Sequence, residues 1–152
     1  MGAVAWASAN PFNGAVFGTL ATLLLAIATR LPRRPIDLDW PLVVICGASL
    51  IVFGSTYPHF VAANSWTEYV YAAPLGLLPC PTLAVTIGIT LMFGLFRVKA
   101  WSAALLAAGF LYGAIGIVRL GVILDALLVL GVAALALVVF TKAVAIRSRR
   151  AR

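Results

Sequence analysis

The sequence predicts an all-α integral membrane protein with about five transmembrane helices. Of the 152 residues, 64% are hydrophobic and 10% are charged, whereas a soluble domain is nearer to one half apolar and one quarter charged. Long apolar runs alternate with short segments that hold prolines and charges. Basic residues gather in the segments on one side of the predicted bundle. These features together predict a single transmembrane domain over residues 1–152.

The positions of the helices follow from the thickness of a bilayer. Its hydrocarbon core is about 30 Å thick, so a crossing helix needs roughly 20 apolar residues. Pro32 and Pro35 separate the first two helices. The last two follow each other so closely that the chain has to reverse between them, and Gly121 suits that turn. The predicted spans lie near residues 12–31, 40–57, 81–97, 100–120 and 122–141.

Small residues recur at regular spacing along three of these spans. In a membrane, helices associate through close packing of small residues, because lipid tails are as apolar as leucine. The first span has such a face at Asn10, Gly14, Gly18, Thr22 and Ala26. The third has one at Thr82, Thr86, Thr90 and Gly94, and the fourth has Gly109 and Gly113 with Gly116 one turn on. We therefore expect Gly14, Gly18, Gly109 and Gly113 to lie in helix contacts.

The longest connection, residues 58–80, is predicted to hold a short helix in the headgroup region. Ser65 and Glu68 have the spacing of a capping box, and aromatic residues surround the predicted helix at 66–73. His59, the only histidine, precedes it. We interpret His59 as a surface residue, with a role as a cofactor ligand as the alternative. No metal site is predicted, because no second histidine or carboxylate pair accompanies it.

The third span opens with Pro79-Cys80-Pro81-Thr82. Proline lacks a backbone N–H, so Pro81 suits the first helical position, with Cys80 as the cap residue before it. We interpret these residues as a helix-start motif, and we expect Cys80→Ser to be tolerated. Redox chemistry at Cys80 is the alternative interpretation.

Threonines recur along the same span at Thr82, Thr86 and Thr90. They would either line a polar path or form a packing seam in which each hydroxyl bonds to the preceding turn. Asp125 begins the last span, with Arg119 close in sequence. This pair would either hold the hairpin together or form a cation or proton site at the outer mouth.

The distribution of lysine and arginine predicts the orientation. Short cytoplasmic loops are rich in both residues. With an outside N-terminus and a cytoplasmic C-terminus, ten of the eleven basic residues fall on the cytoplasmic side, including the basic tail 142–152, and only Arg119 lies outside. Trp40 and Trp101 then lie at the inner boundary. Since topology accounts for the net charge of +7, no nucleic-acid partner is expected.

Residues 57–140 combine several of these features in one order. Tyr57-Pro58, a long connection, Pro-Cys-Pro-Thr and then Gly121-Val122 with Asp125 follow one another. In this respect the chain resembles an uncharacterised family of bacterial multi-pass membrane proteins, classed as a domain of unknown function, with Pro-Cys-Pro-Thr at the start of a late transmembrane helix. The resemblance implies a bacterial inner-membrane protein and carries no activity. Family members typically have about six spans, one more than is predicted here.

The sequence predicts a small non-catalytic membrane protein, either an accessory or structural subunit of a larger membrane complex or a homo-oligomer. It holds no Ser-His-Asp pattern, no HExxH and no phosphate-binding glycine loop. A channel or carrier for a small solute or ion is the alternative, based on the threonines and Asp125. A membrane redox protein using Cys80 is the third. The expected partners are membrane lipids and other membrane subunits or copies of the chain. No cofactor is predicted, with haem, chlorin or quinone as alternatives.

Overall fold

The computed structural model describes residues 11–29, 37–57, 75, 78–94 and 98–150. The regular elements of this part are helices, which confirms the predicted all-α fold. They are α2 (Pro11–Ala28), α3 (Pro41–Ser55), α5 (Pro79–Met92), α6 (Lys99–Leu120) and α7 (Asp125–Arg150). The predicted helix at 66–73 and His59 lie outside the described residues.

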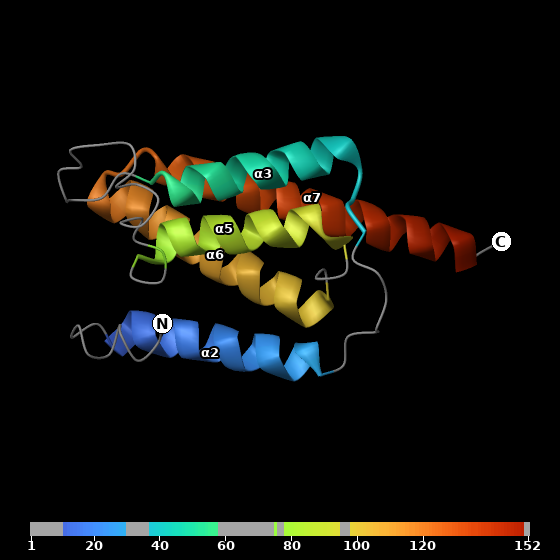
Figure 1. The fold of residues 1–152 in the computed structure, drawn as a ribbon, viewed down its shortest axis with the longest axis horizontal. Coiled ribbons are helices and arrows are strands. Elements are labelled where there is room, and N and C mark those ends of the chain that lie inside the picture. Colours follow the sequence, from blue (N-terminus) through green and yellow to red (C-terminus); the bar gives the residue numbers. More distant parts are fainter. Residues whose placement is uncertain (1–10, 30–36, 58–74, 76–77, 95–97, 151–152) are drawn as a thin grey trace.

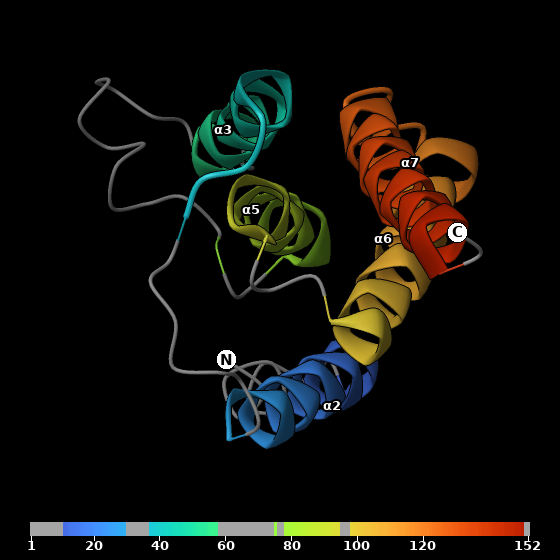
Figure 2. The ribbon, with the colours of Figure 1, turned by 90° about the vertical axis from the view of Figure 1, so that its right-hand side faces the viewer.

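Successive helices run in opposite directions along the long axis of the molecule (Figure 1). The central helix is α5, which packs against α3, α6 and α7. It supplies Leu83, Ile87 and Leu91 to the core, and each is at most 1% exposed. In contrast, α2 packs mainly against α6 and lies at the margin of the bundle (Figure 2).

Two of the described helices are long and apolar enough to cross a membrane, namely α6 and the part of α7 from Asp125 to Ala145. The other three helices are apolar but shorter. Large apolar side chains on the outside of the bundle remain exposed, with Val118 at 79% and Phe140 at 67%. Such a surface suits lipid better than water.

Glycines allow α3 and α5 to touch through their backbones. A Cβ atom added to Gly88 would lie 2.5 Å from the carbonyl oxygen of Gly47, and one added to Gly54 would lie 2.6 Å from the carbonyl oxygen of Pro81. Gly47 and Gly54 are seven residues apart, so they share one helix face. This contact was not among the predicted packing faces.

The predicted packing glycines differ in their surroundings. Gly109 and Gly113 are buried, and added Cβ atoms would lie 2.6 and 2.7 Å from side-chain carbons of Val132 and Val129 on α7. Gly14 is also buried. Gly18 is exposed, and a Cβ there would have no neighbour within 4 Å.

The turn between α6 and α7 lies at Gly121, as predicted. Its φ of 67° is in the left-handed region that glycine adopts without a steric penalty. The N–H of Val122 donates to the carbonyl of Gly116 at 2.9 Å and so completes the helix end.

Three predicted helix boundaries are wrong in an informative way. The helix α5 ends at Met92, with Phe93 in extended conformation, whereas its predicted span reaches residue 97. The helix α5 begins at Pro79, so Leu78, in extended conformation, is the cap residue in place of Cys80. Both prolines fit in the first turn because its N–H groups have no partners within the helix. The helix α7 continues to Arg150, well past the predicted end at residue 141. Its last turns contain alanine, lysine and arginine and no proline or glycine, which favours helix.

Candidate functional site: a buried carboxylate

The first turn of α7 places a carboxylate inside the bundle. The Asp125 side chain is 1% exposed. The hydroxyl of Tyr57, just beyond the end of α3, donates to Oδ1 at 2.7 Å. The thiol of Cys80, in the first turn of α5, donates to Oδ2 at 3.2 Å. One carboxylate therefore joins α7 to α5 and to the end of α3.

The carboxylate needs space that α6 provides at Gly116. A Cβ atom added there would overlap Oδ2 of Asp125 and would lie 2.7 Å from Cγ. No residue other than glycine can therefore occupy this position while Asp125 keeps its place. We call Tyr57, Cys80, Gly116 and Asp125 the Asp125 cluster.

The Tyr57 ring is buried and packs against a second aromatic ring. The residue is 7% exposed. Its ring packs edge-on against Phe53, with the ring centroids 5.4 Å apart and the planes at 75°. Edge-to-face packing favours this ring orientation, in which the hydroxyl is directed at Asp125.

The predicted pairing of Arg119 with Asp125 is wrong. Arg119 is exposed, and within the described residues it forms no ion pair. The Asp125 side chain turns into the bundle, where the two donors occupy its oxygens. The hairpin is closed by the glycine turn and by backbone hydrogen bonds.

The threonine side chains of α5 bond to their own helix. Thr82, Thr86 and Thr90 each donate to the carbonyl four residues earlier, at 2.7 to 2.8 Å. Thr90 also accepts a hydrogen bond from Trp101 Nε1 at 3.1 Å. Trp101 is only 4% exposed, so it anchors α6 to α5 inside the bundle, and its position at the inner membrane boundary stays a prediction. Trp40, in contrast, is 72% exposed.

An ion pair joins elements at the opposite end of the bundle. Lys142 Nζ of α7 lies 2.7 Å from Oδ2 of Asp39, just before α3. The backbone N–H of Asp39 donates to the carbonyl of Met92 at 3.0 Å. Lys142 and Asp39 are 103 residues apart, and no local spacing pointed to this pair.

The chemistry available to the Asp125 cluster is limited. In the part of the chain that the structure describes, no three histidine, cysteine or acidic side chains come close enough to hold a metal ion. Cys80 and Asp125 are brought together, whereas Arg119 stays apart and His59 lies outside the described ranges. Sequence reasoning missed Tyr57 and Gly116 as partners of Asp125. The cluster can hold helices together, and its one carboxylate already accepts two hydrogen bonds.

Replacing Tyr57 with phenylalanine should lower the free energy of unfolding by about 1 to 3 kcal/mol, because Oδ1 of Asp125 then stays buried without a donor. Titration with sodium dodecyl sulfate in mixed micelles, followed by circular dichroism, measures this loss. Cys80→Ser is the matched control, since serine keeps a donor facing Oδ2, and we expect it to change stability by less than 1 kcal/mol. Equal stability of Tyr57→Phe and the unmodified chain would contradict the importance of this hydrogen bond.

The comparisons with known proteins do not test the predicted family. The likeness to the Pro-Cys-Pro-Thr membrane family therefore stays a prediction. A scan against protein-family models gives no match, and neither the curated proteins nor the solved structures contain a significant match to this chain.

Proposed function

We propose that this chain is a small, non-catalytic, multi-pass protein of the bacterial inner membrane that serves as a subunit, bound either to other membrane proteins or to copies of itself. The two long apolar helices support a membrane location. The distribution of lysine and arginine supports five crossings with the N-terminus outside and the C-terminus in the cytoplasm. The Pro-Cys-Pro-Thr resemblance agrees with a bacterial source.

The position of α2 carries the proposal. This helix packs mainly against α6 (Figure 2), and Gly18, Thr22 and Ala26 lie on an exposed face of it. The Thr22 hydroxyl donates to the carbonyl of Gly18 at 2.8 Å, so the face presents few free polar groups. Small residues in a membrane favour close contact with another helix over contact with lipid. A neighbouring subunit would supply that helix.

The polar side chains offer less support for a channel or carrier. Asp125 is buried, with hydrogen bonds to both oxygens, and the threonine hydroxyls of α5 donate to their own backbone. A conducting path needs polar groups that face a water-filled space. For the redox alternative, Cys80 already donates to Asp125 and has no second thiol beside it, because the other cysteine, Cys46, is exposed on α3.

Extraction in a mild detergent followed by mass measurement tests the proposal. The chain has a mass of 16.0 kDa, and we expect it to be recovered in a larger assembly. Gly18→Leu should shift it to the single chain, because the added side chain blocks close approach of a second helix. Leu24→Phe, at an exposed position on the side of α2 away from Thr22 and Ala26, should leave the assembly intact. Recovery of the unmodified protein only as a monomer without a co-purifying partner would refute the proposal.

A further inference from the structure

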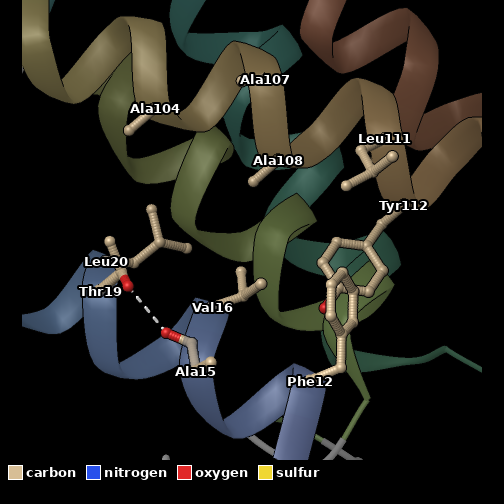
Figure 3. Close-up of a pocket in the computed structure, with 10 residues that line it drawn as sticks. All are labelled: Phe12, Ala15, Val16, Thr19, Leu20, Ala104, Ala107, Ala108, Leu111 and Tyr112. Atoms are coloured by element: carbon tan, nitrogen blue, oxygen red, sulfur yellow. Dashed lines mark hydrogen bonds between the residues drawn. The ribbon is translucent and has the colours of Figure 1, made fainter.

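An apolar groove runs between α2 and α6 (Figure 3). It has a volume of about 340 Å³. Val16 and Leu20 line it from α2, and Ala104 and Ala108 line it from α6. The rings of Phe12 and Tyr112, with centroids 6.0 Å apart, lie together at one end. The small alanine side chains leave this space open, because they do not reach across to α2.

A second depression continues the groove along α6. It measures about 610 Å³ and shares Ala107 and Leu111 with the first. From there it passes Ile115 and Val118 and ends at Arg119. Arg119 and Ala107 are twelve residues apart, or about 18 Å along a helix. This is close to the depth of the hydrocarbon of one leaflet, about 15 Å.

Arg119 lacks an anionic partner within the described part of the chain. The nearest carboxylate in sequence, Asp125, is buried and bonded to Tyr57 and Cys80. Asp39 is paired at the other end of the bundle. Val118 and Leu120 next to Arg119 are 79% and 71% exposed, and Ile123 just beyond the turn is 83% exposed. The Arg119 guanidinium is therefore bordered by exposed apolar residues. An arginine in this setting favours a phosphate, whose oxygens match its planar set of donors.

We propose that this strip of α6, from Arg119 to Ala107, binds one anionic phospholipid. The phosphate contacts Arg119, and one acyl chain lies along Val118, Ile115 and Leu111, with its end in the groove beside α2. The proposal rests on the membrane location proposed above and adds a specific ligand to it.

The charge at Arg119 argues against a second copy of the chain on the same strip. Copies in one membrane share an orientation, so a twofold contact along α6 would place the two Arg119 side chains at the same depth and facing each other. Two guanidinium groups that face each other repel, whereas a lipid phosphate would neutralise the Arg119 guanidinium. The strip and the exposed small-residue face of α2 are therefore assigned different occupants.

Lipid retention by the full-length purified protein tests the proposal. Native mass spectrometry is carried out from neutral detergent with phosphatidylglycerol or phosphatidylcholine of the same acyl chains. The unmodified chain should retain phosphatidylglycerol about fivefold better, and Arg119→Gln should remove this preference. Arg119→Lys should restore only part of it, because lysine keeps the charge and lacks the planar set of donors. Lys99→Gln, which removes an exposed charge at the opposite end of α6, should leave it unchanged.

A second variant examines the acyl-chain part of the strip. Ala107→Phe should lower retention of both lipids, because Ala107 lines both depressions and the new ring would fill part of their space. Soluble glycerol phosphate, which has the headgroup chemistry without the chain, should not displace the lipid. Circular dichroism checks that each variant keeps its helix content.

Several results would overturn the lipid site. These are an unchanged lipid preference in Arg119→Gln, an equal loss in Lys99→Gln, or displacement by glycerol phosphate. A change in assembly mass in Ala107→Phe without a change in lipid retention would assign the strip to a protein partner and refute the proposal. Failure of the subunit proposal would look different, since a monomeric chain would still retain phosphatidylglycerol through Arg119.

Discussion

Replacing Gly116 with alanine should destabilise the protein by about 3 kcal/mol and disrupt the Asp125 cluster. The new methyl group would overlap Oδ2 of Asp125. Either α6 moves away from α7, which opens the core, or the carboxylate leaves Tyr57 and Cys80, which leaves buried polar groups without partners. Titration with sodium dodecyl sulfate in mixed micelles measures the loss.

Gly18→Ala is the matched control for this substitution. It adds the same methyl group to a helical glycine that has nothing within 4 Å inside the chain, so we expect the isolated monomer in mixed micelles to lose no stability, whatever the variant does to assembly. The double variant Gly116→Ala/Asp125→Ala tests the mechanism, because removal of the carboxylate frees the space that the methyl group needs. The double variant should lose clearly less stability than the sum of the losses caused by Gly116→Ala and Asp125→Ala alone. A strictly additive result would contradict a direct conflict between Gly116 and Asp125.

Replacing Gly88 with alanine should cost a similar amount, about 3 kcal/mol, by separating α3 from α5. The added Cβ would lie 2.5 Å from the carbonyl oxygen of Gly47 and 2.8 Å from Ile51 Cγ1. A backbone carbonyl within a helix cannot rotate away, so the helices have to move apart along their contact. The same unfolding titration, together with protease accessibility of α3, measures the effect.

Gly131→Ala provides the comparison for the backbone contact at Gly88. Its Cβ would also be crowded, at 2.7 and 2.9 Å from two atoms, but both are methyl carbons of Leu50. That side chain can change rotamer, so we expect a loss of only about 1 kcal/mol. If Gly131→Ala were as damaging as Gly88→Ala, the distinction between backbone and side-chain contact would be wrong.

The fold class and the order of the helices were predictable because they depend on local properties. In a membrane, an apolar run has to form its own backbone hydrogen bonds, and only a helix does so within one segment. The turn at Gly121 was predictable for a similar reason, since two helical runs meet there without room for a longer connection. Helix ends were less accurate, as α5 at Pro79 and α7 at Arg150 show, because several neighbouring positions satisfy the same capping requirement.

The Asp125 cluster was predictable only in part. Asp125 drew attention as a carboxylate in an apolar sequence, and Cys80 as part of Pro-Cys-Pro-Thr. Their partners are remote, since Tyr57 is 68 residues and Cys80 is 45 residues from Asp125. Arg119 was the more obvious candidate because it is only six residues away. Proximity in sequence therefore predicted the wrong partner for Asp125. The side chain of Asp125 points into the bundle at the start of α7, which brings it to Tyr57 and Cys80.

The sequence by itself therefore determined that this chain is helical and rich in membrane-compatible segments, because hydrophobic length and proline positions act within each segment. Only the tertiary structure decided which glycines touch, that Asp125 pairs with Tyr57 and Cys80, and that Arg119 borders an apolar strip. These contacts depend on how each helix is rotated about its axis and at what height it meets its neighbours. That choice is made by the packing of all the helices together, and no single segment encodes it.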